Sequence, residues 1–578
     1  MSVEKLIVDH METWTSALQT RSTAGRGSSG KIDLYGIKKL RELILELAVR
    51  GKLVPQDPND EPASELLRGM KKQQEDLIKE RKIKKPKKLP SIDGTLESIS
   101  VPQGWELCYL NDIGDWGAGA TPNRTNSGYY GGDIPWFKSG ELSEDYITDS
   151  EEHITALALK ECSLRDNQPG DVLIAMYGAT IGKTSILNSR STTNQAVCAC
   201  TPFDGLSNQY LLIFLKASKK VFTAMGAGGA QPNISKEKIV ATLFALPPLN
   251  EQLRIVKKVE QLMSLCDQLE QQSLTSLDAH QQLVETLLGT LTDSQNAEEL
   301  AENWARISEH FDTLFTTEAS VDALKQTILQ LAVMGKLVPQ DPNDEPASEL
   351  LKRIAQEKAQ LVKEGKIKKQ KPLPPISDEE KPFEIPTSWE WVRFGTITTS
   401  RLGKMLDKAK NKGTPKKYIR NVNVQWDNIF LDDINEMKFE DNELSEFILR
   451  NGDLLVCEGG EPGRCAIWNK PGEFYFQKAL HRVRTFCNIP AKILAIHLKN
   501  DSSNGRLENL FTGVTIKHLP GDKLQQYVIP LMPLNEQNNI IAKLNLLLDI
   551  CDSLSNKIKT AQQTQLHLAD ALTDAAIN

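Results

Sequence analysis

Residues 44–67 read ILELAVRGKLVPQDPNDEPASELL, and residues 328–351 read ILQLAVMGKLVPQDPNDEPASELL. The second stretch follows the first by 284 positions, and only Glu46/Gln330 and Arg50/Met334 differ among the 24 aligned pairs. A solenoid would repeat every 20–50 residues or so, whereas this period is near half the chain. The repeat therefore predicts two equivalent halves related by a pseudo-twofold axis.

A spacing of 284 positions at the entry and 285 at the exit recurs at the borders of two dissimilar inserts. The sequence Val101-Pro102 with Trp105-Glu106 returns as Ile385-Pro386 with Trp389-Glu390, and Pro248-Leu-Asn-Glu-Gln252 returns as Pro533-Leu-Asn-Glu-Gln537. Between these borders, residues 107–245 and 391–530 have comparable lengths but share little sequence. We call the repeated sequence around the inserts the frame. A frame that occurs twice and carries two dissimilar inserts is suited to recognising two different ligands or sites with the same overall geometry.

Composition indicates an ordinary globular protein of several domains. The 578 residues are 40% apolar and 25% charged, as in soluble domains. No apolar run approaches the roughly 18 residues of a membrane span, and the N-terminus lacks the pattern of a signal peptide. Nine cysteines, an odd number without framework spacing, favour a reducing cytoplasm. Cys198 and Cys200 have no second pair to complete a metal site.

Charge is unevenly distributed along the chain. The net charge of −7 argues mildly against a nucleic-acid binder, since neutralised phosphates dominate such affinity. However, residues 68–88 carry ten Lys/Arg against three acids, and residues 352–371 carry eight against two. Each run is explained equally well as a solvated helix face or as a surface that follows DNA phosphates.

A long helix with heptad spacing follows each insert. The apolar seams, with little Gly and no Pro to interrupt them, predict a coiled coil. The first seam is expected to continue through Ser273, Ser276, His280, Leu283 and Leu287, and the second through Ala561, Leu568 and Leu572. The seam residues are Ile255, Val259, Leu262, Cys266 and Leu269, and then Ile540, Leu544, Leu547, Cys551, Leu554 and Ile558.

The frame and the inserts differ in their expected structure. Ile37–Val49 and Leu324–Val333 have the apolar spacing of amphipathic helices, and each is followed by glycine, proline and aspartate turn formers. The inserts contain short apolar runs bounded by Gly, Asn and Asp, which predict mixed α/β domains with many loops. These runs are 172–174, 196–198, 454–456 and 466–467.

Motifs of catalysis are incomplete. Gly178 and Gly182 are separated by three residues before Lys183-Thr184, whereas a P-loop needs four. Asp453 and Glu458 have nuclease-like spacing, but no lysine follows two residues later. The chain has no Asn/Asp-Pro-Pro-aromatic tetrad for methyl transfer and no dinucleotide-binding turn. We therefore expect that the chain by itself is not an enzyme.

An ordered set of motifs occurs once in each half. Each set begins at Pro102 or Pro386, with the tryptophan three residues later, and ends in the Leu-Asn-Glu-Gln stretch that opens a long helix. The intervening motifs are Ile134–Gly140 with Tyr418–Asn423, Gly170-Asp171…Gly182-Lys183 with Gly452-Asp453…Gly463-Arg464, and Asn194-Gln195 with the partial match Phe476–Ala479. With this set, the chain resembles the DNA-specificity subunit of type I restriction–modification enzymes over nearly its whole length.

The resemblance implies a mixed α/β (α+β) fold with two target-recognition domains separated by two long antiparallel coiled-coil helices. The implied segments are a basic-ended helical frame (1–100), recognition domain 1 (101–250), a central frame with a long helix (251–385), recognition domain 2 (386–535) and a C-terminal helix (536–578). The length of the first segment suggests a subfamily with a long N-terminal extension. Two methylase subunits and two restriction (translocase–nuclease) subunits are the implied partners, and S-adenosylmethionine, ATP and Mg²⁺ are expected in those partners.

Under this hypothesis each insert reads three to five base pairs of double-stranded DNA in the major groove, where the donor and acceptor pattern is unique. Any single candidate also suits an exposed polar loop or a phosphate contact. A rival hypothesis is a pseudosymmetric scaffold that binds two copies of one partner without DNA. The DNA-binding candidates are Lys138, Glu141, Lys183, Asn194, Gln195, Gln231 and Asn233 in the first insert, and Arg401, Lys404, Arg420, Asn421, Asn423, Arg464, Gln477, Lys478 and Lys517 in the second.

Overall fold

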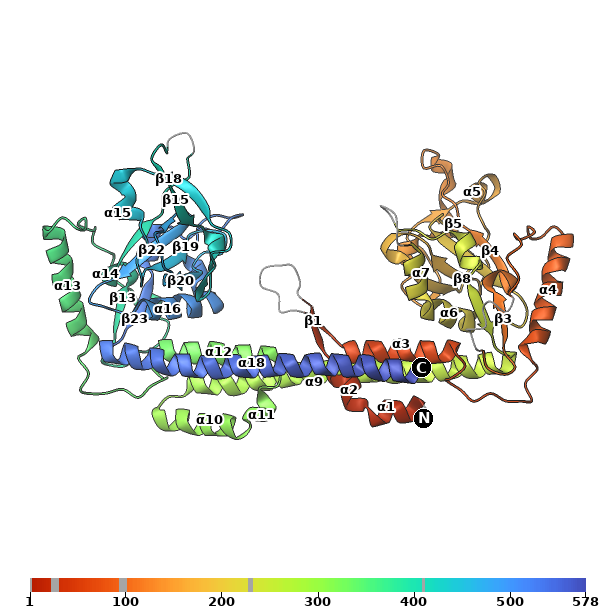
Figure 1. The fold of residues 1–578 in the computed structure, drawn as a ribbon, viewed down its shortest axis with the longest axis horizontal. Helices are drawn as coiled ribbons and strands as arrows, with labels where there is room; N and C mark the ends of the chain where they lie inside the picture. Colours follow the sequence, from red (N-terminus) through yellow and green to blue (C-terminus); the bar gives the residue numbers. More distant parts are fainter. Residues whose placement is uncertain (1–2, 22–30, 93–100, 227–231, 408–410, 578) are drawn as a thin grey trace. The chain divides into compact units, whose positions relative to one another are not determined.

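The chain folds into two compact units in a computed structural model that describes residues 3–21, 31–92, 101–226, 232–407 and 411–577. Unit 1 comprises residues 1–276 with 561–578, and unit 2 comprises residues 277–560. Two long helices, α9 (Leu249–Asp293) and α18 (Leu534–Ile577), contribute to both units (Figure 1). Among the described residues, no helix combines the length and the apolar character needed to cross a membrane.

Unit 1 combines frame helices with a mixed domain. Its other elements are α1 (Val3–Asp9), α2 (Met11–Ser16), β1 (Gln19–Arg21), β2 (Lys31–Asp33), α3 (Tyr35–Val49), α4 (Ala63–Lys79), β3 (Glu106–Tyr109), β4 (Gly114–Ala118), β5 (Tyr130–Phe137), β6 (Tyr146–Ile147), β7 (His153–Ile154), α5 (Ala156–Glu161), β8 (Val172–Ala175), β9 (Thr184–Leu187), β10 (Thr192–Thr193), β11 (Val197–Pro202), α6 (Asn208–Ala217), α7 (Lys219–Gly226), α8 (Lys236–Val240) and β12 (Leu243–Leu246).

Unit 2 has the same kind of organisation. Its other elements are α10 (Ala297–Glu309), α11 (Phe311–Leu314), α12 (Glu318–Val333), α13 (Ala347–Lys363), β13 (Glu390–Arg393), α14 (Phe394–Ile397), β14 (Thr398–Leu402), β15 (Thr414–Ile419), β16 (Val424–Gln425), β17 (Asn428–Ile429), β18 (Asn435–Phe439), α15 (Leu444–Phe447), β19 (Leu454–Cys457), β20 (Cys465–Ile467), β21 (Tyr475–Phe476), β22 (Leu480–Thr485), α16 (Ala491–Ser503), α17 (Gly521–Gln526) and β23 (Val528–Leu531).

The two mixed domains share their central topology. The main sheet has the order β4-β11-β8-β9-β6 in unit 1 and β14-β22-β19-β20 in unit 2. A three-stranded sheet accompanies each, in the orders β10-β5-β7 and β18-β15-β21. The four apolar runs lie in β8, β11, β19 and β20, apart from Ala196, which immediately precedes β11. The expectation of mixed α/β domains is confirmed.

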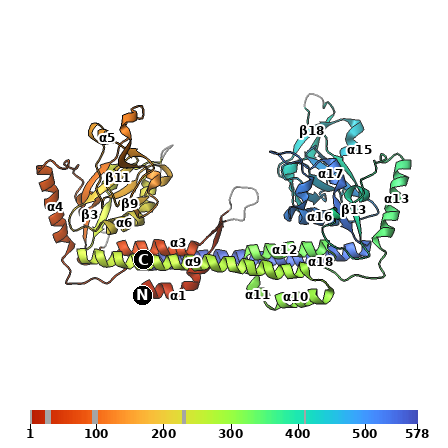
Figure 2. The same ribbon diagram turned by 180° about the vertical axis from the view of Figure 1, so that it is seen from behind.

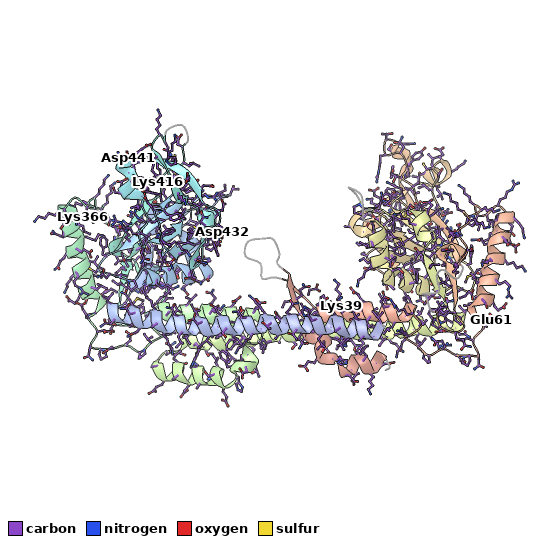
Figure 3. The ribbon with its side chains drawn as sticks, viewed as in Figure 1. Lys39, Glu61, Lys366, Lys416, Asp432 and Asp441 are labelled. Carbon is purple, nitrogen blue, oxygen red and sulfur yellow. The ribbon has the colours of Figure 1, made fainter. Side chains whose placement is uncertain are left out.

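Each mixed domain packs on a helix of its own frame. In unit 1, α6 contacts α3, and in unit 2, α16 contacts α12 (Figure 1 and Figure 2). The two predicted amphipathic helices lie within α3 and α12. Both helices also carry ion pairs to α18: Lys39 Nζ lies 2.8 Å from Asp570 Oδ1 in unit 1, and Lys325 Nζ lies 2.7 Å from Asp552 Oδ1 in unit 2. Figure 3 labels Lys39 on its helix.

A buried carboxylate closes the base of the first domain. Glu251, in the first turn of α9, accepts a hydrogen bond of 2.9 Å from Trp105 Nε1 and one of 3.1 Å from Gln56 Nε2. Gly51 makes room for this contact with a positive φ of 66°; a Cβ there would lie 2.3 Å from Pro102 Cγ. Burial raises the pKa of Glu251. The contact therefore ties the beginning of the insert, its end and the repeated stretch together.

The second domain repeats this contact residue for residue. Glu536 accepts a hydrogen bond of 2.8 Å from Trp389 Nε1 and one of 2.5 Å from Gln340 Nε2. Gly335 takes a φ of 74°, and a Cβ there would lie 2.7 Å from Pro386 Cγ. Burial raises the pKa of Glu536 as well. We call these two sets, Trp105–Glu251–Gln56 and Trp389–Glu536–Gln340, the frame contacts.

The long helices bury most of the predicted seam residues. Ile255, Val259, Leu262, Leu269, Ile540 and Leu544 are buried. Leu547, Leu554 and Ile558 are partly buried against the core of unit 2, which also contains Val284, Leu288 and Leu291 of α9. Supercoiling of the two helices around each other stays a prediction.

The predicted continuation of each seam is right only in part: Ser273, His280, Leu287 and Leu572 are half-buried, and Leu287 packs against the core of unit 2. Leu283 and Leu568 are exposed by 51% and 42%, respectively, and Ser276 and Ala561 are exposed too. The inward positions are Leu277, Val284, Gln565, Ala569 and Thr573. A straight α-helix drifts by about 20° per heptad against a strict 3.5-residue repeat. After a few heptads, the buried stripe has therefore moved to the next column of residues.

A further piece of the repeat escaped the sequence analysis. Ile7-Val-Asp-His10 near the end of α1 corresponds to Ile307-Ser-Glu-His310 near the end of α10, at an offset of 300 instead of 284. Ile7 and Ile307 are both buried. The offset changes because the segment between α2 and α3 is longer than the segment between α11 and α12. Short helical stretches at a shifted offset give too few identities to be found by spacing alone.

The frame contact makes stability depend on pH in a defined direction. Because burial raises the pKa of Glu536, burying this carboxyl costs least below its ordinary pKa, where it is protonated, and stability is lost as the pH rises through the folded value. The hydrogen bond from Trp389 limits that loss, because it favours the charged carboxylate and lowers its pKa. Trp389→Phe removes the indole N–H and should lower the free energy of unfolding of unit 2 by about 1–3 kcal/mol, more at pH 8 than at pH 5. Denaturant unfolding of the full chain across this range measures the difference.

The matched control is Trp304→Phe, which removes the same N–H from a partly buried indole in the core of unit 2. It should give no such pH dependence. Equal losses for Trp389→Phe at both pH values would contradict the assigned role of the Trp389–Glu536 hydrogen bond.

Candidate nucleic-acid interface

One candidate residue in each domain directly follows an equivalent strand. β5 pairs in parallel with β10, and β15 pairs in parallel with β21. Lys138 follows β5, and its backbone N–H donates to Glu141 Oε2 over 2.6 Å. Arg420 follows β15, and its N–H donates to Asn423 Oδ1 over 2.9 Å. Lys138 and Arg420 are therefore structural equivalents at the start of short 3-10 turns.

Each of these two cations is held by an acid on a neighbouring segment. Lys138 Nζ lies 2.7 Å from Glu152 Oε1, and Arg420 Nη2 lies 2.5 Å from Asp433 Oδ2. Lys138 and then Arg124, through hydrogen bonds, hold the pKa of Glu152 below its usual value. Arg124 also lies over the rings of Tyr130 and Trp136.

Backbone hydrogen bonds join the loops of unit 1 that carry the candidates. Asn194 N donates to Phe137 O over 2.9 Å, and Lys183 Nζ reaches Gly140 O at 3.4 Å. Asn233 forms a β-bridge with Tyr177. We call this set, with residues 119–126, 138–141, 177–183, 193–196 and 232–234, the first loop array. Gln231 lies outside the described residues.

The second domain has a corresponding set, the second loop array, formed by residues 401–405, 420–423, 458–464, 476–479 and 511–519. Gln477 N donates to Ile419 O over 3.2 Å, and Lys478 N donates to Lys404 O over 2.9 Å. Asn421 Nδ2 donates to Gly459 O over 3.1 Å. The structure thus brings the candidates of each domain together on adjoining loops.

Three candidates serve chiefly as internal supports. Glu141 accepts hydrogen bonds from Lys138 N, Ser150 Oγ and Glu151 N. Asn423 is buried, and its amide also donates to Asp433 O over 2.9 Å. Lys404 is only 7% exposed and forms an ion pair with Glu443. A side chain that reads a base edge needs free donors or acceptors in the groove, so these three positions favour a supporting role.

The remaining candidates differ in how strongly they are engaged. Arg401 pairs with Glu446 and lies over the Phe447 ring. Arg464 pairs with Glu461 at 2.8 Å and donates to Asn421 O over 3.0 Å, and Lys517 pairs with Glu508 at 2.8 Å.

The amides and the exposed lysine lie nearer the surface. Gln195 is exposed and accepts from Thr121 Oγ1, and Asn194 accepts from Ala196 N over 3.0 Å. Asn233 and Lys478 are exposed, whereas Lys183 and Gln477 are half-buried. This subset keeps the most polar surface for a ligand.

Sequence reasoning missed Arg124 and His518. Arg124 shares Glu152 with Lys138, and His518 Nδ1 lies 3.2 Å from Glu458 Oε2 within the second loop array. The turn sequence Thr121-Pro-Asn-Arg124 offered a weak signal for the first. His518 is adjacent to the candidate Lys517, but its partner Glu458 is 60 residues away in the sequence.

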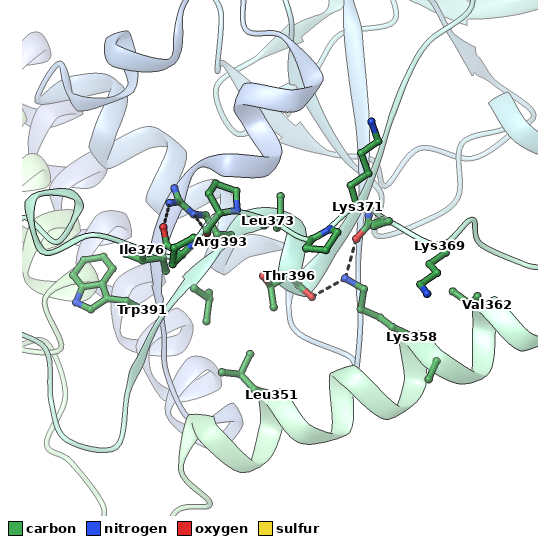
Figure 4. A pocket seen from close by; sticks show the side chains of 16 residues that line it. Leu351, Lys358, Val362, Lys369, Lys371, Leu373, Ile376, Trp391, Arg393 and Thr396 are labelled. Atoms are coloured by element: carbon green, nitrogen blue, oxygen red, sulfur yellow. Dashed lines mark hydrogen bonds between the residues drawn. The ribbon is translucent and has the colours of Figure 1, made fainter.

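The basic runs are partly neutralised by their own helices. Arg68 pairs with Glu65, and Lys352 pairs with Glu349. Lys358 lies at a cavity of about 750 Å³ between α13, residues 369–376 and β13 (Figure 4). Its Nζ donates to Gly395 O over 3.1 Å and to Gln370 Oε1 over 2.9 Å, and burial lowers its pKa. The exposed cations of the two runs without an ion pair in the described structure are Lys71, Lys72, Arg81, Lys84, Lys85, Lys87 and Lys88 in unit 1 and Lys363, Lys368, Lys369 and Lys371 in unit 2.

Seven of the nine cysteines are buried, and Cys162 and Cys487 are partly exposed. Cys198 and Cys200 lie on β11 and are fully buried, and burial raises the pKa of Cys198 to about 12. Among the residues that the structure describes, no group of three His, Cys, Asp or Glu side chains is arranged to hold a metal ion.

Comparison with known proteins identifies the family. Residues 102–279 and 386–562 each match the type I restriction modification DNA specificity domain. The chain is 48% identical to the type I restriction enzyme EcoAI specificity subunit and 44% identical to the EcoEI specificity subunit, both of Escherichia coli, over 100% of this chain and of each relative. A solved chain from work on complex assembly of the type I R-M system aligns with a TM-score of 0.48 and 16% identity, over 83% of this chain and 99% of that chain. The chain belongs to the family of type I restriction–modification specificity subunits.

Proposed function

We propose that this chain directs a type I restriction–modification complex to a bipartite, asymmetric site in double-stranded DNA. The observation that carries the proposal is one frame contact repeated around two different loop arrays. Because the frame contacts are the same, both domains are attached to the frame in the same way. Because their loops differ, the two domains have different specificities. Each loop array enters the major groove and reads one half of the site, because that groove distinguishes all four base pairs.

Within each array, the chemistry of a side chain indicates whether it contacts a base or a phosphate. Lysine and arginine suit the O6 and N7 acceptors of guanine, and asparagine and glutamine suit adenine. Lys183, Gln195 and Asn233 are the base readers that we favour in the first array. Lys478 and Gln477 are those in the second. The exposed lysines after α4 and α13 hold phosphates, which supply affinity without sequence information.

The two long helices act as the spacer between the recognition domains. Helices of 45 and 44 residues without a break are about 65 Å long at 1.5 Å per residue. We propose that they run antiparallel as a coiled coil and relate the two frames by a pseudo-twofold axis. The domains then divide as 1–100, 101–250, 251–385, 386–535 and 536–578. Two equivalent frames predict two equivalent partners.

Those partners are two methylase subunits, joined by two restriction subunits in the complete complex in the cytoplasm. The chain supplies recognition and no catalytic group, so S-adenosylmethionine, ATP and Mg²⁺ bind to the partners. The rival hypothesis of a scaffold without DNA readout is disfavoured by membership in a DNA-specificity family. It also gives no reason for two loop arrays of different sequence within one preserved frame.

If this chain supplies recognition and its partners supply catalysis, the proposal can be tested directly. The purified chain should incorporate no labelled methyl groups into DNA and should cut none, because its sequence lacks the methyl-transfer tetrad, the P-loop and the nuclease triad. A methylome of a strain that carries the complete system should reveal one asymmetric site with two specific parts and a nonspecific gap. Steady methyl transfer by the chain alone, or a continuous palindromic site, would contradict the proposal.

Lys404 and Lys478 separate support from recognition. Lys404→Ala leaves Glu443 without its partner, so unit 2 should lose about 2–3 kcal/mol, less than for a fully buried pair because Glu443 is a third exposed. Lys478→Ala should leave stability unchanged and weaken DNA binding. If Lys478 reads guanine, discrimination at one base pair falls by about 1–3 kcal/mol; if it holds phosphate, binding weakens evenly across sequences.

Both variants are measured by denaturant unfolding and by titration of target and random duplexes with the chain and a methylase subunit. Unchanged stability in Lys404→Ala, with loss of specificity instead, would mean that Lys404 reads DNA and that its buried ion pair opens on binding.

A further inference from the structure

The loop at residues 511–519 of the second array carries two apolar side chains outward at its tip, whereas Phe511 and Leu519 at its ends pack against the core of unit 2. Val514 is completely exposed and Ile516 is 64% exposed. Thr512 and His518 exchange two backbone hydrogen bonds of 2.9 Å, which close the loop. Gly513 has a φ of 92°, and a Cβ there would lie 2.2 Å from Ile516 O. Only glycine fits this turn without strain, so the tip is a built conformation with two exposed β-branched residues.

Several contacts seat this loop within the second array. Leu519 N donates to Glu458 O over 2.7 Å, and the Lys517 ammonium lies over the Phe511 ring. Glu458 N in turn donates to Ala479 O over 2.9 Å, beside the candidate Lys478. The apolar tip is therefore held at a fixed place next to the polar side chains that we assign to base reading. Val422 and Met405, in the same array, are also exposed by more than half.

The first domain has different chemistry at the equivalent positions. Ile234 N donates to Met176 O over 2.9 Å, as Leu519 N does to Glu458 O, and the bridge of Asn233 with Tyr177 matches the bridge of His518 with Gly459. This alignment puts Gly229 and Gln231 of the sequence opposite Val514 and Ile516; those two residues lie outside the described part of the chain. A partner that docks equally on both halves would need similar residues at both places.

We propose that Val514 and Ile516 read thymine in the half-site of the second domain by contact with its 5-methyl group. The 5-methyl group of thymine is the one apolar group that a standard base presents in the major groove, and apolar side chains recognise it by contact. β-Branched side chains suit this role because few rotamers are lost on contact. The inference rests on the proposed function and adds one base to the specificity of one half-site.

Exchange of thymine for uracil tests the contact, since uracil differs only by lacking that methyl group. The full chain with a methylase subunit is titrated with target duplexes that carry uracil at one thymine at a time, on either strand. Uracil at one or two positions of the second half-site should weaken binding about 3- to 5-fold, the value of one buried methyl group. Val514→Ala with Ile516→Ala should bind the thymine duplex correspondingly less tightly and no longer distinguish uracil.

Two controls separate this contact from general effects. Uracil in the first half-site should have the same effect on the wild type and on the double variant. Leu157→Ala removes a comparably exposed apolar side chain on α5 and should retain the wild-type response to uracil.

A wild type that ignores uracil throughout the second half-site, or a half-site made only of G·C pairs, would overturn the assignment while sequence-specific binding stands. A double variant that loses a methylase subunit instead of thymine discrimination would assign the loop to protein docking. Equal binding of target and random DNA by the wild type would contradict the proposed function itself, and the loop assignment with it.

Discussion

The hydrogen bond between a tryptophan N–H and a buried glutamate at the base of each domain is the contact on which the rest of the structure depends. Trp105 comes just before the first insert and Glu251 just after it, in the first turn of α9, while Gln56 belongs to the repeated stretch. One carboxylate thus holds both ends of the insert to the frame. The same arrangement in Trp389, Glu536 and Gln340 mounts the second insert identically. A buried carboxylate is tolerated because its oxygens are hydrogen-bonded.

Fixed ends leave the far loops free to differ. Within each domain the sheets supply strands of defined register, and the described candidate residues lie on the loops next to them, apart from Arg401, which lies in β14. Hydrogen-bonded supports such as Glu141 and Lys404 fix the loops, so exposed neighbours such as Gln195 and Lys478 can change without loss of the fold. This separation of support from surface is what allows one frame to carry two specificities.

The sequence was sufficient to predict the repeated frame, but not the roles of individual loop residues. Repetition at a constant offset located the borders, and short apolar runs located the strands β8, β19 and β20. Beyond Leu269 and Ile558 the predicted phase of the long helices was only partly right, with Leu283 and Leu568 exposed, because helical drift accumulates with length.

The support roles of Glu141, Asn423 and Lys404 could not be foreseen, since they depend on Ser150, Asp433 and Glu443, which only the tertiary fold brings near. Arg124 escaped notice for the same reason, because Glu152 is 28 positions away. Periodicity encodes burial along one element, whereas the partner of a polar side chain depends on how several elements pack.

We propose above all that the two domains read DNA independently of each other and are attached to the frame by equivalent contacts. The most direct test replaces residues 107–245 with the corresponding insert of a relative, keeps Trp105 and Glu251, and determines the methylome of a strain that carries the resulting complex. Independent domains contribute nearly additive binding energies, so one half of the methylated site should change and the other half and the gap should stay as they were. A change in both halves would show that the domains are coupled, and it would contradict the account.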